Sequence, residues 1–212
     1  MSEKAPYQVG IDYDGVFIKK AGQLDIPRRA TKFGLPSMQG VVEGVNFLRK
    51  QPDVDLLGVY TVRPQWLREG QTRRQVERRG FPVERIVHTT NSPVDKVRQL
   101  LYDSVGFGSG PYPSTGKVEP FQIPLSVEDI VAKGLRRVIL IDDSSDKIIE
   151  AAKQLYDEDP SLRPLLERFT HIAFNPKQPE KLEGLIIPRK IHVVTMRDWS
   201  DIGNAMKEIR FA

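Results

Sequence analysis

Short apolar runs alternate with longer segments in which apolar residues recur at helical spacing. The runs are rich in Val, Ile and Leu and are bounded by turn residues, which is typical of buried strands. The predicted strands are residues 8–11, 55–61, 81–89, 137–141, 170–174 and 191–195. The segments between them predict amphipathic helices. These predicted helices are residues 41–50, 65–79, 92–103, 126–133, 147–157 and 199–209.

The regular alternation of strand and helix predicts the fold class. It favours an α/β protein with a doubly wound, mostly parallel, Rossmann-like sheet, because a parallel connection needs a crossover helix. The 212 residues suit a single domain. Two stretches interrupt the pattern with Pro, Gly and little periodicity. We expect residues 18–40 to form a flap or loop insertion, and residues 103–125 to form a Gly/Pro-rich insertion.

Two carboxylates follow the first apolar run, in the sequence IDYDG. Side chains two positions apart on a strand point to one side, so Asp12 and Asp14 should project together from the carboxyl edge of the sheet. Gly15 then lets the backbone turn away. Ligands bind at this edge in open α/β sheets. Two like charges so close favour a bound cation such as Mg²⁺, although Asp-x-Asp-Gly is also ordinary turn chemistry.

Polar residues also end two later strands and begin one helix. Thr61 closes the second apolar run, and Asp142 and Asp143 close the fourth, with Asp146 in the next turn. Lys96 falls in the first turn of a predicted helix, where a cation opposes the helix dipole. Structural alternatives are open: acidic residues favour a helix start by capping it, and lysines are common at protein surfaces.

Composition narrows the functional classes. Apolar residues make up 39% of the chain and charged residues 28%, as in globular proteins, and there is no cysteine. Disulfides and thiolate metal sites are therefore excluded. The N-terminal residues lack the apolar run of a signal peptide, and no segment is long enough to cross a bilayer. We therefore expect a cytoplasmic protein without a membrane partner.

The net charge of +4 is mildly basic. It permits an anionic substrate without pointing to nucleic acid. Four arginines within residues 73–79 give one predicted helix a positive face, which is either solvated or an anion or nucleic-acid surface. The three histidines, His88, His171 and His192, share no metal-ligand spacing and are interpreted as structural residues.

Taken in order, these motifs resemble those of the haloacid dehalogenase (HAD) superfamily of phosphohydrolases. IDYDGV is similar to the family's first motif, VYT to its second and VILIDDSSD to its fourth. Its third motif is a helix lysine, for which Lys96 fits, while Lys117 or Lys133 could compete for the role. The resemblance covers the whole chain as a fold, and the first and fourth motifs together are specific.

The resemblance implies a role for each matching residue. Asp12 would attack phosphorus to form an aspartyl-phosphate, and Asp14 would protonate the leaving oxygen and then activate water. The implied ligands of Mg²⁺ are Asp12, the Asp14 backbone carbonyl and Asp142, with Asp143 or Asp146 in support. Thr61 and Lys96 would hold the phosphoryl oxygens.

The resulting expectation is a magnesium-dependent phosphatase that acts on a phosphorylated small molecule. The segment between the first two strands is too short for a large helical cap, so we expect an open site. A basic entrance with Arg63 as a substrate contact and Arg68 nearby would suit a large or polyanionic substrate. Two alternatives are a phosphatase acting on nucleic-acid ends and a non-catalytic HAD-like binding or scaffold protein.

Overall fold

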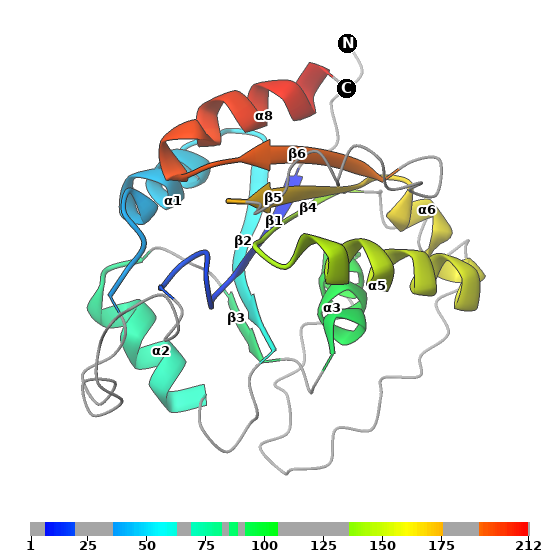
Figure 1. The fold of residues 1–212 in the computed structure, drawn as a ribbon, viewed down its shortest axis with the longest axis horizontal. Coiled ribbons are helices and arrows are strands. Elements are labelled where there is room, and N and C mark those ends of the chain that lie inside the picture. The colour runs from blue at the N-terminus through cyan, green and yellow to red at the C-terminus, as the bar shows by residue number, and fades with distance from the viewer. Residues whose placement is uncertain are drawn as a thin grey trace.

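A six-stranded sheet forms the centre of the molecule in the computed structural model (Figure 1). The structure describes residues 7–19, 36–62, 69–81, 85–88, 92–105, 136–175 and 191–211. The strand order is β3-β2-β1-β4-β5-β6, and every neighbouring pair is parallel. The order therefore reverses direction between β1 and β4, which makes that pair the topological switch point.

The strands and helices follow the predicted alternation closely. The strands are β1 (Tyr7–Asp12), β2 (Val54–Thr61), β3 (Arg85–His88), β4 (Arg137–Asp142), β5 (Phe169–Phe174) and β6 (His192–Met196). The main helices are α1 (Val41–Arg49), α2 (Glu69–Arg78), α3 (Pro93–Ser104), α5 (Ser145–Glu158) and α8 (Ile202–Phe211). Three short helices complete the described elements: η4 (Pro160–Leu162), α6 (Arg163–Leu166) and η5 (Trp199–Asp201).

Helices cover both faces of the sheet, as Figure 1 shows. On one face, α1 and α8 pack on the apolar side chains of β1, β2, β5 and β6, and Val76 of α2 joins the same core. On the other face, α3, α5 and α6 pack on β2, β3, β4 and β5. Burial of both faces explains why the strands read as nearly continuous apolar runs. The fold is thus an α/β arrangement with a Rossmann-like strand order.

Local signals set several of the element boundaries. Ser92 caps α3, because its hydroxyl accepts the backbone N–H of Asp95 at 3.1 Å and Pro93 occupies the first helical turn. Gly80 follows α2 with a φ of 66°, and Gly15 follows β1 with a φ of 94°. Both values lie in the left-handed region that glycine adopts without strain. The chain therefore leaves these two elements where the sequence predicts a turn.

The structure corrects some predicted boundaries. Phe81 is not part of the third strand, which is described over Arg85–His88, and the short helices η4 and α6 were not predicted. The last predicted helix is divided into η5 and α8. The predicted helix at 126–133, most of the insertion at 103–125 and the central part of the flap lie outside the described residues. Among the helices that are described, none has the length and apolar character needed to span a membrane.

Candidate functional site

The switch point places the ends of β1 and β4 side by side. The two strands pair in register from Tyr7 with Arg137 to Ile11 with Ile141, so Asp12 and Asp142 follow at neighbouring positions. Two residues before Asp12, Gly10 faces Leu100 of α3. Since side chains two apart on a strand share a face, Asp12 points toward the face that α3 and α5 cover. In sheets of this topology, the carboxyl ends of the strands at the switch point form the ligand crevice.

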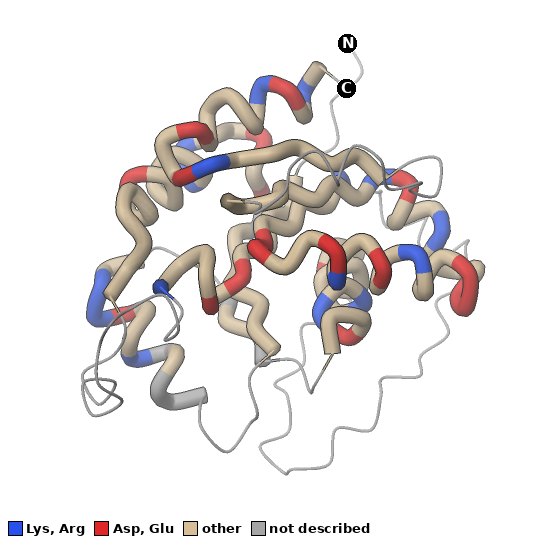
Figure 2. The backbone as a smooth tube through the Cα atoms, viewed as in Figure 1, with Lys and Arg blue, Asp and Glu red and all other residues tan. Residues whose placement is uncertain are grey.

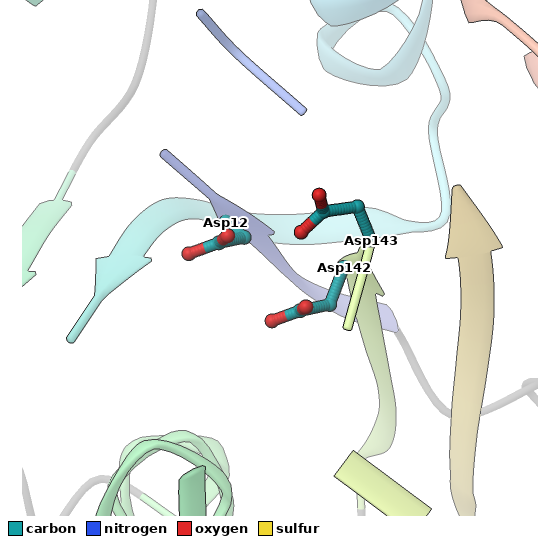
Figure 3. Close-up of side chains that lie close together, drawn as sticks. All are labelled: Asp12, Asp142 and Asp143. Carbon is teal, nitrogen blue, oxygen red and sulfur yellow. The ribbon is translucent and has the colours of Figure 1, made fainter. Parts of the chain in front are cut away.

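Three carboxylates come together at this crevice. Oxygens of Asp12, Asp142 and Asp143 lie within 4.8 Å of one another. Figure 3 shows Asp12 at the end of β1 and the other two where β4 ends. Asp12 and Asp142 are buried, whereas Asp143 is partly exposed. Figure 2 shows the acidic residues gathered where β1 and β4 end and α5 begins.

Lys96 reaches this cluster from the first turn of α3. Its ammonium group donates to Asp12 Oδ1 at 2.6 Å and to Asp142 Oδ2 at 2.7 Å, and the lysine is only 4% exposed. The second oxygen of Asp12, Oδ2, has no hydrogen-bond partner among the residues that the structure describes. One cation thus bridges two buried carboxylates, and it contacts only one of the two Asp12 oxygens.

Burial and charge together shift the ionisation of this cluster. Burial raises the pKa of Asp12 to about 7; Lys96 opposes the shift, and the charges of Asp142 and Asp14 reinforce it. Burial alone would lower the pKa of Lys96, but the two carboxylates outweigh it and raise that pKa above its usual value. Lys96 therefore stays charged, while a proton is held near Asp12 at a pH where a free carboxyl group has lost it.

The turn between β4 and α5 orients the acidic side chains. Asp142 Oδ1 accepts the backbone N–H of Ser144 at 2.7 Å, and the Ser144 hydroxyl lies 3.3 Å from Asp143 Oδ1. With Lys96 on Oδ2, both oxygens of Asp142 have partners. The orientation of its carboxylate is therefore well defined before any ligand binds.

The other predicted residues of the first two motifs lie near the crevice. Asp14 follows β1, forms a bridge with Ile18 and is close enough to Asp12 to raise its pKa. Thr61 ends β2 and is 1% exposed, one position after Tyr60, which pairs with Asp12 in the sheet register. The roles of Asp14 in proton transfer and of Thr61 in phosphate binding stay predictions.

The start of the predicted flap is also at this edge. Met38 donates its backbone N–H to the Phe17 carbonyl, and Lys19 donates to the Pro36 carbonyl, both at 3.0 Å. An isolated antiparallel bridge joins Ile18 with Ser37. The two described ends of the 18–40 segment are therefore paired next to Asp14, while residues 20–35 lie outside the described part of the chain.

Other predicted site residues are not part of this cluster. Asp146 lies in the first turn of α5 with an exposed side chain, and it is not among the three clustered carboxylates. Arg63, Lys117 and Lys133 lie outside the described residues. Among the described residues, Lys96 is the lysine that contacts Asp12 and Asp142.

Three residues shape the acidic turn: Ser144 and Ser145, to which sequence reasoning assigned no role, and His171, which it interpreted as a structural residue. His171 is wholly buried on β5, and its ring lies 2.9 Å from the Ser145 hydroxyl and 3.2 Å from the Leu140 carbonyl. The one available signal was a histidine within the apolar run THIAF. A single buried histidine is not diagnostic, because its partners depend on which strand lies beside it.

Carboxylate oxygens in this arrangement fit a hard divalent cation. Mg²⁺ and Mn²⁺ favour oxygen ligands, and three carboxylates balanced by one lysine leave an excess of negative charge. Comparisons of the chain with protein-family models, with curated proteins and with solved structures found no match. The fold and the site define an α/β protein with a parallel sheet and a lysine-bridged carboxylate cluster at its switch point.

Proposed function

We propose that this protein is a magnesium-dependent phosphatase of the HAD type that hydrolyses a phosphomonoester through an aspartyl-phosphate. The observation that carries the proposal is the bridge from Lys96 to Asp12 and Asp142, with Asp143 within 4.8 Å of them in the crevice. This bridge supports the interpretation that the IDYDG motif, the helix lysine and the IDD motif form one site rather than three unrelated structural features. The strand order supports the same family but is shared by many others.

The proposed first step uses Oδ2 of Asp12, the oxygen that Lys96 does not contact. Oδ2 attacks phosphorus, the bond from phosphorus to the ester oxygen breaks, and Asp14 gives its proton to the leaving alcohol. Lys96 stabilises charge on the phosphoryl oxygens while it keeps Asp12 oriented. Thr61, at the end of the adjacent strand, is the proposed second phosphate contact.

In the second step, Asp14 takes a proton from water, and the water oxygen attacks the phosphorus of the aspartyl-phosphate. The bond from phosphorus to Asp12 breaks, inorganic phosphate leaves and the carboxylate is restored. Asp12, Asp142 and Asp143, with the Asp14 backbone carbonyl as a further ligand, would hold Mg²⁺, and Asp146 is the less favoured supporting ligand because it is not one of the clustered carboxylates. Bound Mg²⁺ would neutralise the clustered carboxylates and the phosphoryl oxygens.

The decisive experiment measures hydrolysis of p-nitrophenyl phosphate with Mg²⁺, with chelator and after Asp12→Asn. We expect chelation to abolish turnover and Asp12→Asn to lower it by about 10⁴-fold or more, because the nucleophile is lost. Asp157→Asn on the exposed side of α5 is the matched control and should retain wild-type activity. Equal activity of Asp12→Asn and the wild type would refute the proposal.

A metal-binding scaffold without turnover is the second candidate. It is favoured by Lys96, which satisfies two buried carboxylates without any substrate. Metal binding without hydrolysis of any phosphomonoester would indicate the scaffold. For an active protein, a panel of sugar phosphates, nucleotides and 3′-phosphorylated oligonucleotides would distinguish a small-molecule phosphatase from one acting on nucleic-acid ends.

A further inference from the structure

The acidic turn is connected to β5 by one buried histidine. His171 pairs with Leu140 in the register of β4 and β5, and its side chain is 0% exposed. Its Nδ1 lies 3.2 Å from the Leu140 carbonyl oxygen, and its Nε2 lies 2.9 Å from Oγ of Ser145. Ser145 is the first residue of α5 and is itself buried. The imidazole thus contacts the chain two residues before Asp142 and two residues after Asp143.

The partners of the ring determine its tautomer. A carbonyl oxygen only accepts hydrogen bonds, so Nδ1 must carry a proton to donate to Leu140. In a neutral imidazole Nε2 is then an acceptor, and the Ser145 hydroxyl must donate to it. Burial lowers the pKa of His171 to about 4, against the opposing influence of Asp142, so the neutral ring is the form present near neutral pH.

A chain of contacts leads from this ring to the carboxylates. Ser145 is held by His171, and the preceding Ser144 donates its backbone N–H to Asp142 Oδ1 at 2.7 Å. The Ser144 hydroxyl lies 3.3 Å from Asp143 Oδ1. Rotation of Ser145 away from β5 would therefore move both aspartates of the cluster, since they belong to the same turn.

We propose that His171 is a positioning residue, which holds Ser145 through a hydrogen bond and thereby orients Asp142 and Asp143 for a divalent cation. The inference rests on the metal site of the proposed function, but it does not require turnover. A histidine outside the cluster then controls metal affinity without being a ligand. Outer partners of this kind change metal affinity by about 10-fold to 100-fold when they are removed.

The test measures Mn²⁺ binding to the full-length protein by electron paramagnetic resonance, with circular dichroism to verify folding. Ser145→Ala removes the hydroxyl donor and leaves the imidazole in place, and we expect its affinity for Mn²⁺ to fall about 10-fold or more. His171→Leu should have the same effect, while His171→Gln keeps an amide oxygen as an acceptor and should recover much of the affinity.

Ser104→Ala is the matched control. Ser104 is also buried, and its hydroxyl donates to the Leu101 carbonyl at 2.6 Å in the last turn of α3. We expect Ser104→Ala to lose about as much thermal stability as Ser145→Ala does, while its Mn²⁺ affinity equals that of the wild type. A merely structural role for Ser145 would give the same pattern as Ser104.

The outcomes separate this inference from the proposed function. If folded Ser145→Ala and His171→Leu bind Mn²⁺ as tightly as the wild type does, His171 does not position the site and the inference is wrong, whether or not the protein hydrolyses phosphoesters. If the wild type binds no Mn²⁺, both proposals fail. If the variants lose affinity but the wild type has no phosphatase activity, the inference stands and the proposed function falls.

Discussion

Among single residues, Lys96 is the one that connects the two buried carboxylates of the site. The lysine is 4% exposed, and its ammonium group lies 2.6 Å and 2.7 Å from two buried carboxylates. An isolated buried charge is strongly unfavourable, so each of the three groups depends on the others. Three carboxylates face one lysine, so the cluster carries excess negative charge. This charge favours the binding of a cation.

The raised pKa of Asp12 predicts a pH-dependent metal affinity. In the metal-free protein this carboxyl holds a proton below about pH 7, and a cation must displace that proton to use the carboxylate. We expect Mg²⁺ affinity to fall as the pH decreases below 7, by up to about 10-fold per pH unit for one proton. Isothermal titration calorimetry in two buffers of different ionisation enthalpy measures the number of protons released when Mg²⁺ binds.

Proton release on Mg²⁺ binding should be near one at pH 6 and near zero at pH 8.5. Asp12→Asn tests whether the released proton comes from Asp12, because this variant lacks the titrating carboxyl group. Release of no proton at pH 6 by the wild type would show that Asp12 is ionised before the metal arrives.

The lowered pKa of His171 predicts an effect on acid stability. Its pKa falls from 6.5 to about 4, so between these values the unfolded chain binds a proton that the folded protein does not. The free energy of unfolding therefore decreases as the pH falls through this window, by about 2–3 kcal/mol. His171→Gln lacks this titration. We therefore expect its free energy of unfolding to lie below that of the wild type by a smaller amount at pH 4.5 than at pH 7.5. Urea unfolding at both pH values measures this difference. A difference that does not change with pH would contradict the lowered pKa of His171.

Among the elements, α3 must be placed correctly for Lys96 to reach the crevice. A buried polar network holds the middle and end of this helix. The Tyr60 hydroxyl donates to Asp103 Oδ2 at 2.6 Å, and Gln8 Nε2 lies 3.1 Å from that hydroxyl and donates to the Leu100 carbonyl at 3.2 Å. The network thus ties α3 to β1 and β2 at the opposite end from the ion pairs.

Removal of one hydroxyl tests this network. Tyr60→Phe leaves a buried carboxylate and a buried amide each short of one partner, so we expect a loss of about 1–3 kcal/mol in the free energy of unfolding. Tyr7→Phe is the matched control, because among the described residues the Tyr7 hydroxyl accepts one bond, from partly buried Arg137 at 3.2 Å. Its cost should stay below about 1 kcal/mol. Urea denaturation compares the two, and equal costs would mean that the buried network contributes little.

For the whole molecule, packing between distant segments supports the edge that carries the site. Trp199 lies in η5, near the other end of the chain from β1, yet its indole N–H donates to the Val16 carbonyl at 2.9 Å, in the loop that follows Asp12. The ring also packs on Phe174 at the end of β5. Gly44 of α1 lies so close that a Cβ there would be 2.3 Å from the ring.

A pair of glycine substitutions tests this packing. Gly44→Ala would force α1 and Trp199 apart, and overpacking of this kind costs about 1–3 kcal/mol. Gly203→Ala is the matched control on α8, because the nearest atom, on Phe47, is 3.8 Å from the added Cβ. The control should be neutral or stabilise by up to about 1 kcal/mol, since alanine favours the helix. Thermal unfolding gives both values, and a neutral Gly44→Ala would contradict the close approach.

The sequence was sufficient to predict the six strands, the main helices and an acidic edge. Apolar runs and turn residues are local features, and burial on both sheet faces follows from them. The same local reasoning placed the carboxylates at strand ends. It could not rank them, because the path of the chain from β4 into α5 decides that Asp143, in the turn, joins the cluster while Asp146, on the helix, has an exposed side chain.

Contacts between distant residues required the folded chain. The order β1-β4 at the switch point brings Asp12 beside Asp142, and the position of α3 brings Lys96 to both. His171 was interpreted from sequence as an ordinary structural residue, because its partner Ser145 is adjacent only after β4 and β5 pair. Burial and hydrogen bonding of a polar side chain are properties of its surroundings, and a linear pattern does not contain those surroundings.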